Sequence, residues 1–227
     1  MRNIIFGRTL VVVCAVFFAA CEKQQPVAPE PDTILGNEFV AGIPLAVGNK
    51  WVYRETILDQ NGAIENTRTY TNEIIREFTD GTQHWFVSRT TEGQTSTETY
   101  VANINGAQYY RNPVDSLPLL DLIFPSSSSK SFNRDVVVSG LKRISDTVVH
   151  VPCTISPMSS IVRVPMGRFF AFQYTTAQVD VPLRSATVNM AEMYLSDQGL
   201  VRIVSYNNLQ GNQYVVSILE LVDITIR

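Results

Sequence analysis

The residues that decide the fold class read WVYRETILDQNG and occupy positions 51–62. Trp51, Tyr53 and Ile57 share one parity, and mostly polar or β-branched residues lie between them. A period of two, built from aromatic and β-branched residues, is typical of a β-strand. Asn61-Gly62 then supplies the strongest short-range signal for a hairpin, because both residues tolerate a positive φ angle. We therefore predict a strand that reverses direction at this dipeptide.

The same alternation of strand and turn continues along the chain. Asp80-Gly81, Glu92-Gly93 and Asn105-Gly106 separate segments rich in Thr, Val, Tyr and Ile, at intervals of about ten to twenty residues. Such residues favour strands, and such spacing favours an antiparallel meander in which successive strands pair. Further turn signals follow in the second half: Ser139-Gly140, Pro165-Met166-Gly167 and Asp197-Gln198-Gly199.

These turns predict an all-β fold of roughly ten to twelve strands, with little helix apart from the signal peptide described below. So many strands must curl or split, because flat open sheets of this size are uncommon. We expect an antiparallel meander that forms a curved half-barrel or a sandwich, and a closed barrel remains an alternative. The apolar run Pro113–Phe124 interrupts the pattern. It is expected to form a short helix that begins near Pro118, or an apolar loop lying on the sheet.

The N-terminus has the three parts of a secretory signal peptide. Arg2 and Arg8 are positive, residues 10–20 form an unbroken apolar run, and small residues end that run. The run is shorter than the roughly 20 residues that a transmembrane helix needs. We predict export and removal of residues 1–20, in preference to an uncleaved membrane anchor or a buried helix.

The end of this signal, Phe18-Ala19-Ala20-Cys21, resembles the lipobox of bacterial lipoproteins. In that family the cysteine thiol receives a diacylglyceryl group, and the signal peptide is cut in front of it. The resemblance implies lipid attachment at Cys21 and association with a membrane through this lipid. The family prefers Leu or another aliphatic residue where this sequence has Phe18. The alternative is an ordinary cut near Ala20 that leaves Cys21 as a free thiol.

The rest of the chain divides into a tether and a domain. Residues 21–37 contain three prolines and are expected to form a flexible tether after the lipidated cysteine. Residues 38–227 are expected to form a single β-rich domain. With Cys14 in the signal peptide and Cys21 lipidated, only Cys153 remains, so no intramolecular disulfide is expected.

Charge and motifs argue against several functions. The net charge is −3, and removal of Arg2 and Arg8 leaves 16 basic against 21 acidic residues, or −5, with no Lys/Arg-rich block. Nucleic acid is therefore not an expected partner. His84 and His150 lack any catalytic or metal-ligand pattern, so we predict no catalytic residue, no metal site and no cofactor. An envelope enzyme that acts on glycans through carboxylates remains an alternative, because such enzymes follow no spacing rule.

Aromatic residues on the predicted strands are the candidates for ligand binding. Phe170, Phe172 and Tyr174 alternate along one predicted strand, and a period of two places them on one face. Trp51 and Tyr53 share a face of another strand in the same way. These residues are expected either to fill the core, as aromatic side chains usually do, or to line an apolar groove for a lipid, an acyl chain or a peptide.

Three short motifs are similar to those of uncharacterised β-rich bacterial lipoproteins. Residues 44–53 resemble their opening, in which Gly precedes a Trp-x-Tyr strand. Residues 164–169 resemble their Pro-x-Gly-x-Phe turn, and residues 194–201 resemble their Gly-Leu-Val hairpin. The motifs imply structure and no activity. By analogy of fold class, the likeness extends to half-barrel carriers and chaperones that move lipoproteins between membranes.

These features predict a lipoprotein anchored in the cell envelope, at the outer membrane, that acts as a non-catalytic binding or interaction module. Its partner would be a protein or an apolar ligand. One alternative is a carrier of lipid or another apolar ligand in a curved β-sheet groove. A second alternative is the glycan-active envelope enzyme.

Overall fold

The structure is a computed structural model that describes residues 34–35, 42–113, 117–125, 131–138, 147–181, 187–209 and 212–227. All of them lie in the unit Pro31–Arg227. The expected signal peptide (residues 1–20), Cys21 and all of the expected tether (residues 21–37) except residues 34–35 lie outside the described residues.

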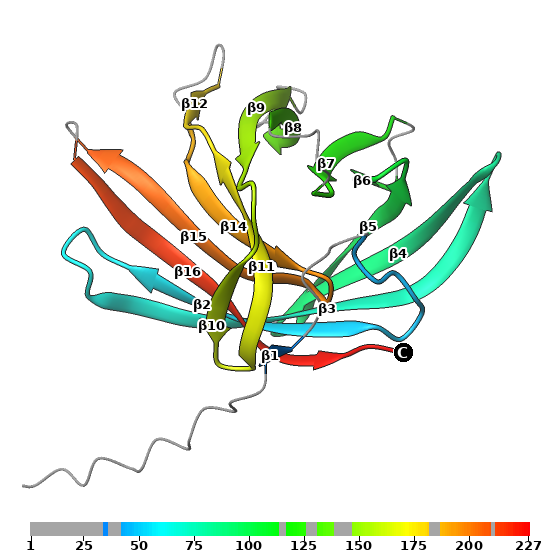
Figure 1. The fold of residues 1–227 in the computed structure, drawn as a ribbon, viewed down its shortest axis with the longest axis horizontal. Helices are drawn as coiled ribbons and strands as arrows, with labels where there is room; N and C mark the ends of the chain where they lie inside the picture. The colour runs from blue at the N-terminus through cyan, green and yellow to red at the C-terminus, as the bar shows by residue number, and fades with distance from the viewer. Residues whose placement is uncertain are drawn as a thin grey trace, which may run out of the picture. The chain divides into compact units, whose positions relative to one another are not determined.

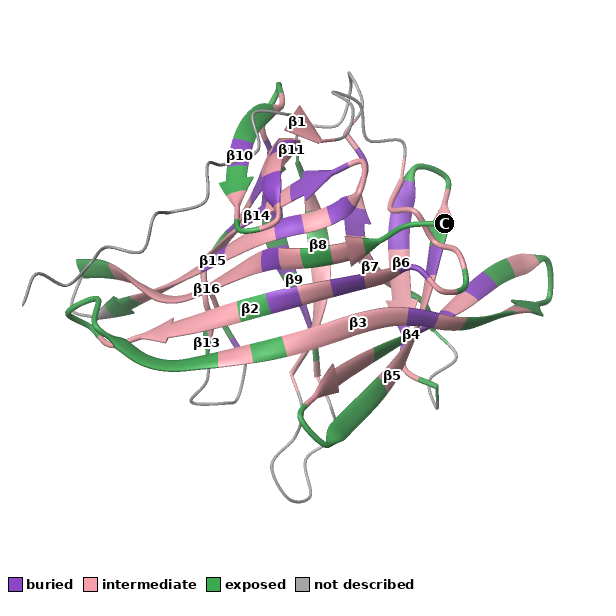
Figure 2. Cartoon of the chain, turned by 90° about the horizontal axis from the view of Figure 1, so that it is seen from below, coloured by how far each residue is buried: buried purple, intermediate pink, exposed green. Residues whose placement is uncertain are grey.

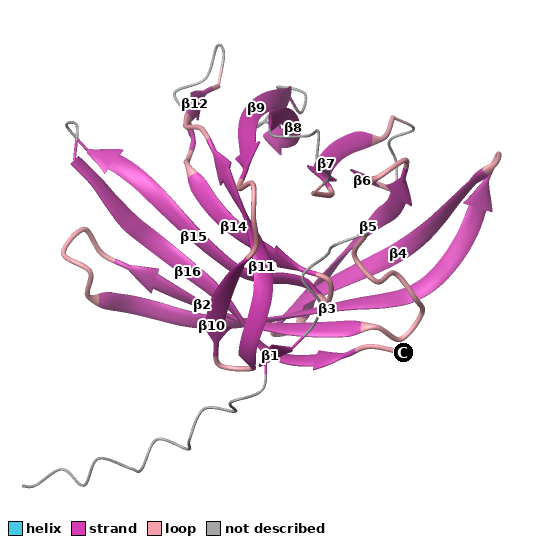
Figure 3. Cartoon of the chain, in the orientation of Figure 1, coloured by secondary structure: helices cyan, strands magenta, loops and turns pink. Residues whose placement is uncertain are grey.

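The described part of the chain is built from strands and loops (Figure 3). This confirms the predicted all-β fold. None of the described segments is a helix long and apolar enough to span a membrane. The strands are β1 (Ile34–Leu35), β2 (Lys50–Leu58), β3 (Ile64–Asp80), β4 (Gln83–Glu92), β5 (Thr95–Ile104), β6 (Ala107–Arg111), β7 (Leu119–Ile123), β8 (Ser131–Val138), β9 (Thr147–Ile155), β10 (Ser160–Val164), β11 (Gly167–Thr176), β12 (Val179–Asp180), β13 (Thr187–Val188), β14 (Ala191–Ser196), β15 (Gly199–Leu209) and β16 (Asn212–Thr225).

Twelve strands follow one another in a continuous antiparallel path, in the order β7-β6-β5-β4-β3-β2-β16-β15-β14-β11-β9-β8. The predicted meander is therefore confirmed, because most neighbours in the sheet are also neighbours in the sequence. β10 pairs with β11, and β1 joins the same strand in a parallel pair. β12 and β13 form a separate two-stranded ladder.

The middle of the sheet joins the two ends of the β unit. β2 pairs with β16, so that Tyr53 lies opposite Leu221 and Trp51 lies opposite Ile224. From this central pair the N-terminal strands extend one way to β7, and the C-terminal strands extend the other way to β8 (Figure 1).

The sheet curls until its two edge strands, β7 and β8, lie beside each other. Side chains bridge them. The Leu120 backbone N–H donates to Asp135 Oδ2 over 2.9 Å, and Arg134 forms an ion pair with Asp121 over 2.7 Å. Tyr110 OH, from the neighbouring β6, donates to the Asp135 carbonyl over 2.9 Å. We call this β7–β8 boundary the seam. The curved arrangement among the predicted alternatives is thus the one observed, and it is nearly closed.

The core lies on the inner face of the curved sheet. Burial alternates along many strands, and in β9 every second position from Val149 to Ile155 is buried. Figure 2 shows the same alternation of buried and intermediate residues in the first half of β2. One buried cluster gathers around Trp51, Phe169 and Leu221. A second gathers around Cys153, Tyr174 and Leu195. Both clusters combine residues that are distant in sequence, which is what holds the curl together.

The segment Pro113–Phe124 differs from the prediction. Residues 119–123 form strand β7, which pairs with β6 through Ala107–Ile123 and Tyr110–Leu119, so the expected helix or loop is wrong there. Leu122 is buried, as is Phe124 just after the strand. Pairing with the exposed edge of β6 outweighs the helix propensity of the leucines.

A short strand also lies within the expected tether. Ile34 and Leu35, within the expected tether, pair with Arg168 and Phe169 of β11. Leu35 packs against the cluster around Trp51.

Candidate functional site

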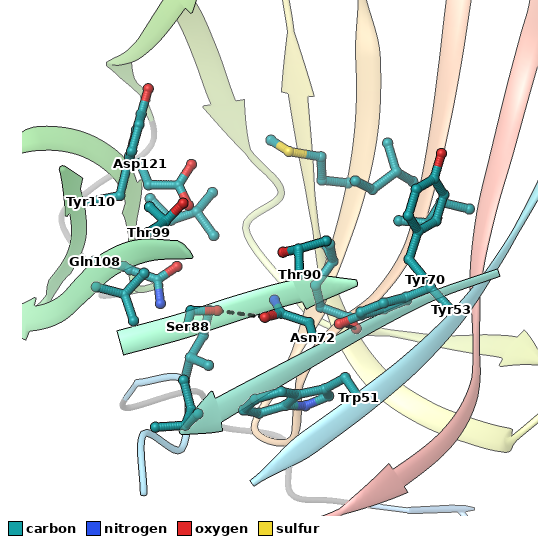
Figure 4. A pocket seen from close by; sticks show the side chains of 18 of the residues that line it. Trp51, Tyr53, Tyr70, Asn72, Ser88, Thr90, Thr99, Gln108, Tyr110 and Asp121 are labelled. Atoms are coloured by element: carbon teal, nitrogen blue, oxygen red, sulfur yellow. Dashed lines mark hydrogen bonds between the residues drawn. The ribbon is translucent and has the colours of Figure 1, made fainter. Parts of the chain in front are cut away.

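A partly open cavity of about 560 Å³ lies inside the curved sheet (Figure 4). Its volume falls within the range of about 300–1,000 Å³ that is typical of small-molecule sites. The lining side chains come from β2 to β8, from β14 to β16, and from the loop that precedes β2. The cavity therefore exists only because the two halves of the sheet curl around a common interior.

One part of the lining is apolar. We call this part the apolar floor: Trp51, Tyr53, Ile74, Leu200 and Leu219. The loop before β2 adds Ile43 and Leu45, which also pack against the cluster around Trp51. Burying an apolar group against this surface is favourable by roughly 25 cal/mol for each Å² of apolar area removed from water. The floor can therefore hold the hydrocarbon part of a ligand.

The adjoining part of the lining is polar and uncharged. We call it the polar strip: Asn72 of β3, Ser88 and Thr90 of β4, Thr99 of β5 and Gln108 of β6. The register explains why they gather. Asn72 lies opposite Thr90, and Ser88 lies opposite Thr99, so the members of each pair project from the same face. Ser88 also donates a hydrogen bond to Asn72 Oδ1.

Gln108 is the buried member of the strip that makes no side-chain hydrogen bond to a described residue. It is only 7% exposed. A primary amide carries two N–H donors and one carbonyl acceptor. The amide atoms of Gln108 are not among the fully buried polar atoms that lack a partner, so they remain accessible from the cavity and offer binding capacity to whatever enters it.

The three ionised groups that line the cavity already have partners. Asp121 pairs with Arg134 over 2.7 Å, and Glu55 pairs with Arg68 over 3.1 Å while accepting a hydrogen bond from Tyr70 OH over 2.8 Å. The adjacent Asp121 carboxylate raises the pKa of Arg134. Burial, followed by the bond to Glu55, raises the pKa of Tyr70 to about 12. At neutral pH Tyr70 is therefore an uncharged donor, and Arg134 is a compensated cation.

Two of the predicted site residues, Trp51 and Tyr53, line the cavity. Trp51 Nε1–H donates to the Gln198 carbonyl over 2.7 Å, and Tyr53 OH donates to the Leu200 carbonyl over 2.9 Å. Burial raises the pKa of Tyr53, so its hydroxyl stays protonated. The polar atoms of both rings are thus used to fasten β2 to the β14–β15 hairpin, and their ring surfaces remain for the cavity.

The other three predicted site residues, Phe170, Phe172 and Tyr174, are not among the lining residues. Tyr174 is fully buried and donates its hydroxyl to the Ile123 carbonyl over 2.8 Å. Phe170 lies opposite Ile161 of β10, whereas Phe172 lies opposite Leu195 of β14. Their part in ligand binding stays a prediction, but it would need a different surface from this cavity.

The physical reason is a change of partner within β11. Residues 167–171 pair with β10, and residues 172–176 pair with β14. The buried positions shift with the partner, from Phe169 and Ala171 to Tyr174 and Thr176. A strict period of two therefore does not continue through this strand.

Sequence reasoning missed the polar strip. A strand face that carries Ser, Thr, Asn and Gln is usually exposed to solvent, so the sequence alone does not predict that these residues line a cavity. A signal was nevertheless present: Asn72, Ser88 and Thr99 each share parity with an apolar neighbour two residues away, namely Ile74, Phe86 and Val101. Polar residues in phase with a buried face are the pattern that marks a polar interior.

The histidines lie outside the cavity. His84 Nε2 lies 3.2 Å from Glu77 Oε2, and His150 Nδ1 lies 2.6 Å from Asp135 Oδ1, with both rings at least half exposed. Within the described residues, no group of three or more His, Cys, Asp or Glu side chains is placed to hold a metal ion.

Comparison with known proteins supports the fold alone. No family model matches the chain, and no curated protein matches it significantly. A crystal structure of a protein from Parabacteroides distasonis, provisionally described as a lipoprotein, is similar with a TM-score of 0.50 at 12% identity, covering 84% of this chain and 100% of that chain. The structure of an exported protein with a YmcC-like fold from Bacteroides fragilis gives a TM-score of 0.46 at 12% identity, covering 83% of this chain and 100% of that one.

Proposed function

We propose that this protein is a lipoprotein anchored at the outer membrane, and that it is a non-catalytic module binding an amphipathic small molecule inside its curved sheet. The observation that carries this proposal is the cavity of about 560 Å³, with the apolar floor beside the polar strip. A ligand that has both an apolar and a polar part would match both surfaces. This deepens the interpretation of the sequence as a binding module and favours the carrier alternative.

The envelope location rests on the N-terminal sequence. The charged start, the apolar run and the lipobox-like Phe18-Ala19-Ala20-Cys21 support export and lipid attachment. Two or more acyl chains make membrane association durable, since each buried CH₂ contributes about 0.8 kcal/mol. The description of the Parabacteroides distasonis protein as a lipoprotein agrees with this location.

Metabolic labelling tests the anchor. A radiolabelled fatty acid should enter the full chain expressed in a bacterial host, and Cys21→Ser should abolish the label and keep the signal peptide uncut. Cys153→Ser is the matched control, because its thiol is buried and should not receive lipid. A parent chain that never takes up label contradicts the anchor.

Native mass spectrometry tests the cavity. After mild extraction from envelope membranes, the parent protein should carry a bound small molecule. Ser217 lines the cavity opposite Ser205, so Ser217→Trp should fill the space and displace the ligand without removing a core side chain. Ser96→Trp on the exposed part of β5 is the matched control and should retain the ligand. An empty parent protein, or a Ser217→Trp variant as fully loaded as the parent, contradicts ligand binding in this cavity.

A further inference from the structure

The polar strip and the paired charges together indicate what kind of polar group the cavity accepts. Gln108 is more than nine-tenths buried, lines the cavity, and makes no side-chain hydrogen bond within the part of the chain that the structure describes. Figure 4 shows Gln108, Thr99 and Ser88 on the same side of the cavity, with Asn72 next to Ser88. Neither of the two threonine hydroxyls of the strip, Thr90 and Thr99, bonds to a described side chain or backbone group.

The donors and acceptors of the strip are mixed. The Gln108 amide offers both N–H groups and a carbonyl oxygen, the Asn72 amide keeps its N–H groups while its oxygen accepts from Ser88, and each hydroxyl can do either. A carboxylate or phosphate only accepts hydrogen bonds, and an ammonium group only donates them. A hydroxyl or an amide does both, and it therefore satisfies the strip more completely than an ion of either sign.

The charged groups that line the cavity also favour an uncharged polar group on the ligand. Asp121, Arg134 and Glu55 are held in ion pairs and hydrogen bonds, so a charged ligand would meet no uncompensated opposite charge. Moving an ion from water into a largely apolar cavity without such a partner is strongly unfavourable. An uncharged polar group avoids that penalty.

We propose that the cavity selects ligands whose polar head is uncharged and rich in hydroxyl, ester or amide groups, attached to an acyl or alkyl tail. Acylglycerols represent this chemical class. The head would bond to the strip through Gln108 and Thr99, and the tail would lie on the apolar floor around Trp51 and Ile74. This inference rests on the proposed function, which requires only that an amphipathic molecule enters the cavity.

A tail-matched series of ligands tests the selection. The full chain is freed of bound lipid and titrated, below the micellar concentration of each ligand, with monododecanoylglycerol, dodecanoate and dodecylammonium. Binding is followed by calorimetry and by tryptophan fluorescence. The neutral ligand is expected to bind roughly tenfold more tightly than either ion, and glycerol without a tail is expected not to bind.

Variants of the strip locate the selection. Gln108→Leu should lower the affinity for the neutral ligand roughly tenfold and bring it close to that of the ions, whose affinities should change little. Thr99→Val should also lower the affinity for the neutral ligand, and it provides a second test of the strip in case the Gln108 variant fails to fold. Gln94→Leu, in the exposed turn between β4 and β5, is the matched control and should bind as the parent does.

The outcomes separate the two proposals. If none of the three tailed ligands binds, the proposed function fails. If all bind but an ion binds as tightly as the neutral ligand, or if both strip variants keep the parental preference, the inference about the head is overturned while binding in the cavity stands.

Discussion

Gly199 lies where the β14–β15 hairpin meets the indole ring of Trp51. Its φ angle is +109°, a backbone conformation that residues with a Cβ atom rarely adopt. A Cβ atom placed there would lie 3.0 Å from Trp51 Nε1. The neighbouring Gln198 carbonyl accepts the indole N–H, and the Leu200 carbonyl accepts the Tyr53 hydroxyl. Three consecutive residues thus fasten the hairpin to β2 beneath the cavity.

Substitution of this glycine should destabilise the fold more than substitution of an ordinary turn glycine. Gly199→Ala is expected to cost about 2 to 4 kcal/mol, because backbone strain adds to displacement of the indole ring. Gly93→Ala is the control: its φ is +57° and its Cβ would meet open space, so about 1 kcal/mol is expected. Urea unfolding monitored by tryptophan fluorescence measures both values. Equal losses would show that the contact with Trp51 contributes nothing.

At the scale of strands, the seam is closed by side chains where a closed barrel would use a backbone ladder. Asp135 supplies the central link, since its Oδ2 accepts the Leu120 N–H while its Oδ1 lies 2.6 Å from His150 Nδ1. Arg134 and Asp121 form the second link, and both of them line the cavity. The seam therefore connects the stability of two edge strands to the wall of the candidate site.

Removal of the Asp135 carboxylate should loosen β7 locally. In Asp135→Ala the Leu120 N–H loses a charged acceptor worth about 1.5 to 3 kcal/mol, so its hydrogen exchange should accelerate by roughly ten- to a hundredfold. Asp135→Asn keeps an acceptor oxygen and should accelerate it less. Amides of the β2–β16 pair serve as internal reference. Acceleration spread evenly over both regions, or no change at Leu120, contradicts a local role of the seam.

Strands bounded by glycine turns were predictable from the sequence, and strands defined by distant partners were not. Asn61-Gly62 and Asn105-Gly106 lie between successive antiparallel strands, as their turn chemistry predicts. β7 has no period of two to identify it, because its apolar run acquires a strand conformation from the edge of β6. β11 has a clear period that the change of partner interrupts at Phe172. In both cases the deciding interaction is tertiary, and local sequence does not encode it.

The same limit applies to the candidate site. Trp51 and Tyr53 were predicted because aromatic residues are conspicuous, and they line the cavity. Gln108 was not, because a lone glutamine on a strand becomes meaningful only when the curl places it beside Thr99 and Ser88. A binding site lined by ten strands is a property of closure, and closure depends on the β2–β16 pair that joins residues near opposite ends of the β unit.

At the scale of the whole molecule, the buried thiol and phenol groups of the interior predict that the free energy of unfolding decreases in alkaline solution. Burial raises the pKa of the Cys153 thiol to about 11, and burial also raises the pKa values of Tyr53 and Tyr174. Each group keeps its proton in the folded state after the unfolded chain has begun to lose it. Folding therefore binds protons in alkaline solution, and stability must fall as pH rises.

The thiol contributes a distinct part of this fall. Its stabilisation is fully present below the ordinary thiol pKa near 9 and is lost as pH rises from 9 towards 11, which corresponds to roughly 2 to 3 kcal/mol. The free energy of unfolding from urea titrations at intervals from about pH 8 to pH 11 should decline over that window, and the tyrosines should extend the decline above about pH 10. Cys153→Ala should lower stability at every pH by the loss of packing, but should flatten the slope most between about pH 8.5 and 9.5, where the thiol of the unfolded chain ionises ahead of its tyrosines, whose ordinary pKa is 10. Parallel curves for the parent and Cys153→Ala would mean that the thiol titrates alike in the folded and unfolded chain, and that the interior is wet enough to solvate a thiolate.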